Sequence, residues 1–221
     1  MVNFNKAWEL LDLIMNNILI HGLGQDDKSW DKVKEYLREY NYNVICPNLF
    51  DLLKNDSYEY NDLYDFFEKR INNCKDKVNL CGLSLGGILA LDYAKKHPEK
   101  VNSLILIGVP HKIPKLLFSI QTFIFKLMTQ SNFVKLGLKK NEFINLLKSM
   151  KDLKINDELE QVNCRTLLLC GKEDKLNIKS SKLFNEEIKN SKFKIIKNSG
   201  HEVNIDNPKD LGQIISEFWT V

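Results

Sequence analysis

A glycine-rich segment, Gly82–Gly86 (GLSLG), places Ser84 between an apolar run and an amphipathic one. The apolar run Val78–Leu83 predicts a strand, and Leu85–Lys96 predicts a helix. A tight turn between a strand and a helix lifts a serine hydroxyl away from the sheet, and glycines two residues to either side leave room for it. The helix also directs its first N–H groups at the same place. The pattern predicts a nucleophilic serine; the alternative is a glycine-rich turn with an incidental serine.

A serine hydroxyl is a weak nucleophile until a base accepts its proton. Of the four histidines, His201 lies just past the last apolar run, where a loop can reach back over the sheet, and it is the predicted base. His97 ends a predicted helix and is expected to bind helix-end carbonyls. His21 is better suited to a structural hydrogen bond, and for His111 a surface position is favoured over one in the pocket.

An acid is needed to orient the imidazole of the base and to stabilise its cation. Asp174 follows the apolar run Thr166–Cys170 within the segment GKED, and it is the predicted acid. Glu173 beside it is the less favoured alternative. The chain order serine, aspartate, histidine argues against both carboxylates being simple turn residues.

A second glycine-rich turn, His21–Gly24 (HGLG), follows the first apolar run. Its two glycines allow the backbone to approach a substrate carbonyl closely. The amide of Leu23, together with the amide of Leu85 beside the serine, is the predicted oxyanion hole. Such a turn is a weak signal by itself, and it gains weight from its place in the order of motifs.

Short apolar runs alternate with longer amphipathic ones, which is typical of helices flanking a mostly parallel sheet. Six runs are predicted as strands: Asn17–His21, Asn43–Cys46, Val78–Leu83, Ser103–Ile107, Thr166–Cys170 and Phe193–Lys197. Five stretches are predicted as helices: Ser29–Tyr40, Asp62–Asn72, Leu85–Lys96, Lys179–Asn190 and Pro208–Trp219. The interval from about 111 to 160 breaks the alternation and has helical periodicity. We therefore predict one α/β domain over residues 1–221 with a small helical cap inserted at about 111–160.

The chain has 221 residues, 43% of them hydrophobic, and a net charge of +3. These values are typical of a globular protein and too mildly basic to predict nucleic-acid binding. Five cysteines without metal-ligand spacing predict neither a metal site nor disulfides, and hence a reducing compartment. Neither a signal-peptide core nor a membrane-spanning apolar run is found, so a cytoplasmic location is expected.

The predicted cap is strongly basic. Residues 112–151 contain eight lysines and a single acidic residue, Glu142. The favoured interpretation is a solvated helical face. The alternative is a lid that makes transient contact with an anionic membrane surface or an acidic carrier protein.

The sequence resembles the α/β-hydrolase fold family, and in particular its esterase- and lipase-like members. The resemblance is carried by four segments: HGLG, GLSLGG, GKED and the late segment NSGH. The resemblance extends from Ile18 to Trp219. It implies Ser84 as nucleophile, Asp174 as acid, His201 as base and a cap where the helical interval falls. Family members usually begin with a strand hairpin, and only about seventeen residues precede the first strand here. The resemblance therefore implies a reduced sheet of about six strands.

The resemblance also implies an activity. A small-molecule ester or thioester with a small or medium acyl group would be hydrolysed through an acyl-enzyme, without cofactor or metal. The alternatives are an acyltransferase and a ligand-binding receptor built on the same fold. The sequence indicates neither the physiological substrate nor the oligomeric state.

Overall fold

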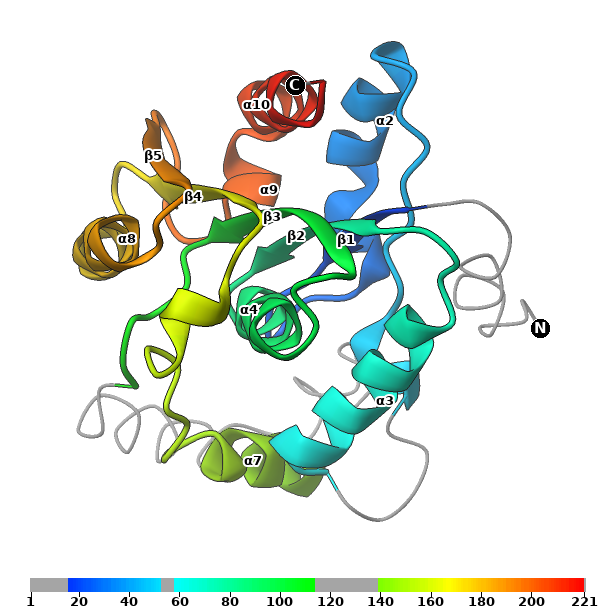
Figure 1. Cartoon of the computed structure of the whole chain (residues 1–221), viewed down its shortest axis with the longest axis vertical. Coiled ribbons are helices and arrows are strands. Elements are labelled where there is room, and N and C mark those ends of the chain that lie inside the picture. The colour runs from blue at the N-terminus through cyan, green and yellow to red at the C-terminus, as the bar shows by residue number, and fades with distance from the viewer. Residues whose placement is uncertain (1–15, 53–57, 114–138, 221) are drawn as a thin grey trace.

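Five parallel strands form the centre of the protein (Figure 1). The computed structural model describes residues 16–52, 58–113 and 139–220. The strands lie side by side in chain order: β1 (Asn17–Ile20), β2 (Val78–Leu83), β3 (Val101–Ile107), β4 (Arg165–Gly171) and β5 (Ser191–Ile196). Every neighbouring pair is parallel. The predicted mostly parallel α/β architecture is therefore confirmed.

The sheet has five strands where about six were predicted, because the run Asn43–Cys46 forms only one isolated bridge to β1. Ile45 donates to Asn17 O at 3.0 Å and accepts from Leu19 N at 2.8 Å. The next donor along this ladder would come from residue 47. That residue is Pro47, which has no N–H, so the pairing stops after one residue.

Helices cover both faces of the sheet (Figure 1). One face carries α3 (Tyr60–Asn72), α4 (Leu85–Lys96), α7 (Lys140–Ser149) and α8 (Lys175–Glu187), and the other carries α2 (Asp31–Glu39) and α10 (Pro208–Trp219). The short elements are η2 (Asp27–Trp30), η3 (Leu49–Leu52), η4 (Leu159–Gln161) and α9 (Val203–Asp206). In the described part of the chain, no helix has both the length and the apolar character needed to cross a bilayer.

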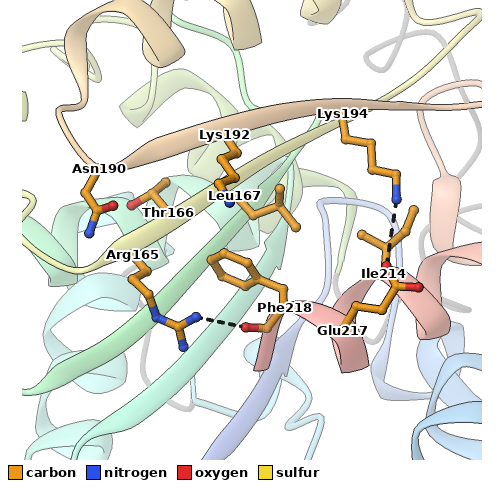
Figure 2. A pocket seen from close by; sticks show the side chains of 9 residues that line it. All are labelled: Arg165, Thr166, Leu167, Asn190, Lys192, Lys194, Ile214, Glu217 and Phe218. Carbon is orange, nitrogen blue, oxygen red and sulfur yellow. Dashed lines mark hydrogen bonds and ion pairs between the residues drawn. The ribbon is translucent and has the colours of Figure 1, made fainter. Parts of the chain in front are cut away.

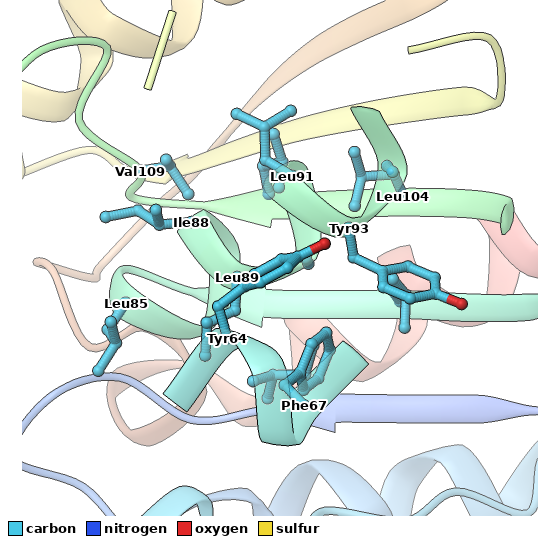
Figure 3. Packing of buried hydrophobic residues seen from close by; sticks show 14 of the residues in the cluster. Tyr64, Phe67, Leu85, Ile88, Leu89, Leu91, Tyr93, Leu104 and Val109 are labelled. Atoms are coloured by element: carbon cyan, nitrogen blue, oxygen red, sulfur yellow. The ribbon is translucent and has the colours of Figure 1, made fainter. Parts of the chain in front are cut away.

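Alternate residues of the strands β1 to β4 enter two separate apolar cores, which is why these strands are rich in apolar residues on both faces. Leu80 and Leu104 face α3 and α4, whereas Cys81 and Ile105 face α2 and α10. Figure 3 shows α4 packed between α3 and the sheet through several large side chains. The helix that follows Ser84 is buried along most of its length, so the start of α4 is a rigid support.

The described part of the predicted cap contains α7, and residues 114–138 of that cap lie outside the described residues. The helical periodicity of the interval includes four apolar residues in and just after this helix. Phe143, Leu146, Leu147 and Met150 are buried. The end of α7 is tied to the start of α3, since Tyr60 N donates to Ser149 Oγ at 2.8 Å.

Candidate active site

The serine of the GLSLG segment lies in a strained turn between β2 and α4. Ser84 has φ 50° and ψ −114°, which places a non-glycine residue at positive φ. A Cβ atom on Gly82 would lie 2.3 Å from the carbonyl oxygen of Gly86, and one on Gly86 would lie 2.4 Å from that of Ile20. No side chain fits at either position. The structure thus gives the steric reason for the glycine spacing that the sequence displays.

The predicted base and acid are in direct contact. His201 Nδ1 and Asp174 Oδ2 are 2.7 Å apart, and the two residues come from different loops at the carboxyl ends of β5 and β4. Asp174 is the N-cap of α8, and its carboxylate accepts from Asn177 N at 3.3 Å. Because of this cap, α8 begins at Lys175, four residues earlier than predicted. The carboxylate bound to His201 is that of Asp174 and not that of its neighbour Glu173.

Gly108 lies directly after β3, at the point where the end of this strand passes between His201 and Ser84. It has φ 57°, and a Cβ atom there would lie 3.1 Å from Nδ1 and Cε1 of the His201 ring. Its neighbour Ile107 accepts a hydrogen bond from Ser84 N at 2.9 Å. The end of β3 therefore contacts both the serine backbone and the imidazole. The described residues contain no hydrogen bond between the Ser84 hydroxyl and His201. Sequence reasoning missed Gly108; its signal was a glycine immediately after a buried strand.

Hydrogen bonds hold the Asp174 carboxylate in its charged form. Burial raises the pKa of this carboxyl, but hydrogen bonds from His201 and Asn177 outweigh burial and leave the pKa below its ordinary value. The side-chain amide of Asn177 donates to both carboxylate oxygens, at 2.8 Å and 3.1 Å. Sequence reasoning missed Asn177. Its signal was its place three residues after the capping aspartate, where side chains of the first helical turn meet the cap.

The HGLG turn lies against the serine: a Cβ atom on Gly22 would be 3.5 Å from Ser84 Cβ. The carbonyl of Gly22 accepts from His21 Nδ1 at 2.9 Å and from Gln25 N at 3.3 Å. A trans peptide directs its N–H opposite to its C=O, so these bonds turn the Leu23 amide away from both donors. That amide has no acceptor within the part of the chain that the structure describes.

Leu85 supplies the second predicted oxyanion donor. It is the first residue of α4, and the first four N–H groups of a helix have no acceptor within it. Ser84 is the N-cap of this helix, so the Leu85 amide belongs to the same turn as the Ser84 hydroxyl. The joint role of Leu23 and Leu85 stays a prediction.

His21 is structural, as predicted. Its ring is fully buried, and its Nε2 accepts from Leu49 N at 2.9 Å while Nδ1 donates to Gly22 O. Burial lowers the pKa of His21 more than its hydrogen bonds and nearby aspartates raise it. The ring is therefore held neutral, in the one tautomer that satisfies both neighbours.

The other two histidines depart from their predicted surroundings. His97 Nε2 lies 2.8 Å from Glu68 Oε1, and the His97 ring packs against the ring of Tyr93. The prediction that His97 binds helix-end carbonyls is therefore wrong. His111 is buried, so its favoured surface position is wrong too: the edge of Phe184 covers the ring, and Nε2 binds Glu187 at 2.8 Å. Both contacts involve helices distant in sequence, which local patterns do not reveal.

A cavity of about 270 Å³ lies at the opposite end of the sheet, between the first halves of β4 and β5 and the helix α10 (Figure 2). Arg165 donates to Phe218 O at 3.1 Å, and Lys194 lies 4.0 Å from Glu217. Two of its cations thus have protein partners, and the cavity is separate from the serine, which lies at the carboxyl end of the strands. Among the residues described, no cluster of three or more histidine, cysteine or acidic side chains could hold a metal ion.

The buried neutral ring of His21 predicts a loss of stability in acid. Between the ordinary pKa of about 6.5 and the lowered pKa of the folded state, the unfolded chain binds a proton that the folded chain does not. The free energy of unfolding should therefore fall by up to about 1.4 kcal/mol per pH unit through this window. Urea unfolding between pH 8 and pH 5 measures this change, with His21→Gln as the reference that cannot titrate. If the free energy of unfolding falls equally with pH in the two proteins, His21 is not the buried neutral group that causes the loss.

Comparison with known proteins agrees with this fold. A family model described as the α/β hydrolase fold matches residues 18–134. A putative 2-succinyl-6-hydroxy-2,4-cyclohexadiene-1-carboxylate synthase of Bacillus subtilis (strain 168) is 24% identical over 184 residues, which cover 65% of this chain and 66% of that protein. A monoacylglycerol lipase of Mus musculus is 20% identical over 250 residues, covering 91% of this chain and 74% of the lipase.

Among solved structures, a thermophilic esterase from Thermogutta terrifontis is similar to this chain, with a TM-score of 0.77 and 22% identity. The match covers 94% of this chain and 90% of the esterase. The predicted α/β-hydrolase fold is therefore confirmed, with five parallel strands flanked by helices. Because the family model matches more than half of the sequence, this chain belongs to the α/β hydrolase fold family.

Proposed function

We propose that this protein is a serine hydrolase that cleaves carboxylic ester or thioester bonds of substrates with a small or medium acyl group. Ser84 is the nucleophile, His201 the general base and Asp174 the acid that orients it. The observation that carries the proposal is the 2.7 Å contact between His201 and Asp174, on a ring packed against Gly108 at the end of the strand that also binds Ser84 N. Catalytic hydrogen bonds are often long before substrate binds, so the open Ser84–His201 pair is compatible with this role.

The proposed reaction has two halves. The substrate carbonyl oxygen lies toward the amides of Leu23 and Leu85 while Ser84 Oγ attacks the carbonyl carbon, and His201 Nε2 takes the hydroxyl proton. Breakdown of the tetrahedral intermediate passes this proton to the leaving alcohol or thiol. Water then attacks the acyl-enzyme with His201 again as base, and the carboxylic acid and free Ser84 are regenerated.

Each surrounding group has a defined part in this scheme. Asp174 is ionised at neutral pH because its pKa is lowered, so it can stabilise the imidazolium that forms in each half-reaction. Its contact with Nδ1 leaves Nε2 as the nitrogen available to the nucleophile. Neither half-reaction requires a metal or a cofactor.

The choice of an ester or thioester bond rests on chemistry and on relatives. A thermophilic esterase and a monoacylglycerol lipase are among the similar proteins, but so is a protein named as a putative synthase. The fold alone therefore does not select the reaction. Acyl transfer would require an alcohol or thiol acceptor in place of water, and a receptor would retain its ligand without turnover.

The basic cap keeps its two interpretations. Within the described residues, Lys139 lies 3.4 Å from Glu142, while Lys148 and Lys151 are exposed on and just after α7. Exposed lysines suit a solvated face, and they would also attract an anionic membrane surface or an acidic carrier protein. Transient contact of this kind stays a prediction.

Covalent labelling tests the nucleophile. A fluorophosphonate should attach to Ser84 and to no other residue, and Ser84→Ala should lose both the label and turnover of p-nitrophenyl acetate and butyrate. The expected loss of turnover is roughly a million-fold, as for other enzymes that lose a triad nucleophile. Ser191→Ala, which alters a half-buried hydroxyl that donates to Ile188 O at the start of the edge strand β5, is the matched control.

Three outcomes would contradict this proposal. An adduct mapped to another residue, or undiminished turnover by Ser84→Ala, would remove Ser84 as nucleophile. Tight ligand binding with less than about one product released per hour would favour a receptor over an enzyme.

Asn177→Leu tests the support of the acid. This change removes the side-chain donors to both carboxylate oxygens but keeps the backbone N–H that Asp174 caps. Because a hydrogen bond to a charged group is worth about 1.5–3 kcal/mol, kcat should fall roughly tenfold or more while KM changes little. Steady-state kinetics on p-nitrophenyl butyrate, normalised to titrated active sites, measure the effect. Asn185→Leu, on the exposed face of the same helix, should leave kcat unchanged, and equal values for the two variants would refute the role.

A further inference from the structure

Two buried amide side chains, Gln25 and Asn204, are hydrogen-bonded to each other in both directions. Gln25 Nε2 donates to Asn204 Oδ1 at 3.3 Å, and Asn204 Nδ2 donates to Gln25 Oε1 at 3.1 Å. The side chains are 7% and 1% exposed. Such a pair costs free energy unless its remaining donors are also satisfied.

The remaining donors do have partners. Gln25 Nε2 also donates to Glu202 Oε1 at 3.1 Å, and Asn204 Nδ2 also donates to Ser29 O at 3.1 Å. The network therefore uses every N–H of both amides, and a fully satisfied network of this kind fixes the segments that carry it.

The segments in question are the two that must be aligned for the proposed reaction. Gln25 lies two residues after Leu23, at the end of the HGLG turn, and Gly24 between them has φ 89°. Asn204 lies three residues after His201, in α9. The pair thus connects the two loops across 179 positions of sequence.

Local hydrogen bonds shape each loop: in the HGLG turn, His21 Nδ1 and Gln25 N both donate to Gly22 O. Two glycines flank Leu23, and the His201 side chain is 44% exposed, so packing alone does not fix the amide or the ring. The His201 loop is held locally where Gly200 N donates to Asp206 Oδ2 at 2.8 Å. Local hydrogen bonds fix the shape of one loop but do not fix its distance from the other loop.

We propose that Gln25 and Asn204 are positioning residues that hold the oxyanion amide of Leu23 and the base His201 in register with each other. This inference rests on the proposed function. A displacement of about 1 Å at a reacting group can lower the rate about a hundredfold. The Gln25–Asn204 pair, called the clamp below, should therefore affect kcat more than substrate binding.

A double-mutant cycle tests the clamp. Gln25→Met and Asn204→Leu each remove one partner at similar volume, and the double variant removes both without leaving either amide unpaired. We expect each single change to lower kcat on p-nitrophenyl butyrate by about tenfold to a hundredfold, with KM within about threefold of wild type. The rate is expressed per active site titrated with a fluorophosphonate, so that unfolded protein does not count.

The double variant should be no slower than the slower single variant, because the two residues act as one unit. Gln213→Met, which alters an exposed glutamine whose side-chain amide donates to Glu217, is the matched control and should match wild type. If Asn204→Leu does not fold, Gln25→Met alone carries the test, since Gln25 borders an open surface pocket where a changed side chain has room.

The outcomes separate the clamp from the proposed function. A wild-type rate per titrated site in either single variant, or losses that multiply in the double variant, would overturn the clamp while leaving the hydrolase intact. Wild-type protein that is neither labelled at Ser84 nor active on the esters would instead overturn the proposed function.

Discussion

The backbone conformation of Ser84 is the constraint on which the rest of the site depends. At φ 50° and ψ −114° this residue lies outside the regions that L-amino acids favour, at a cost of about 1–3 kcal/mol. It persists because its surroundings leave no alternative: Ser84 N is bound to Ile107 O, the flanking glycines touch backbone, and α4 is buried behind it. The strain places a hydroxyl and a free helical N–H at one point. Every other candidate group is arranged around that point.

Two ionisable side chains near it are held in opposite states by the balance between burial and hydrogen bonding. Burial dominates at His21, which has to stay neutral because one ring nitrogen accepts the Leu49 N–H. Hydrogen bonds dominate at Asp174, which stays charged because His201 and Asn177 both donate to it. The neutral ring orients the peptide that carries the Leu23 amide, and the charged carboxylate orients the imidazole. The same balance of burial and hydrogen bonding thus orients a backbone amide on one side of Ser84 and an imidazole on the other.

The sequence predicted the parts of this structure that local patterns control. The strand and helix around Ser84, and the carboxylate after β4, were found where spacing and periodicity placed them. The predicted strand at Asn43–Cys46 was lost because apolar character alone does not reveal that Pro47 stands at the next donor position of the ladder.

The supporting contacts were beyond sequence reasoning for a different reason. Gly108 packs on His201, and Gln25 pairs with Asn204, across long separations that only the assembled sheet brings together. His111 was expected at the surface because the covering side chains come from α8, more than seventy positions later. Motifs therefore brought out the candidate groups, while the residues that contact them could be found only from the fold.

A crystal structure of the protein carrying a phosphonate adduct would test the central claim most directly. The account predicts an adduct on Ser84 Oγ, with its phosphoryl oxygen about 2.7–3.1 Å from the amides of Leu23 and Leu85. It also predicts His201 Nε2 within about 2.6–3.2 Å of Ser84 Oγ while Nδ1 stays bound to Asp174. A phosphoryl oxygen that contacts neither amide, with the imidazole turned away from Ser84, would contradict it.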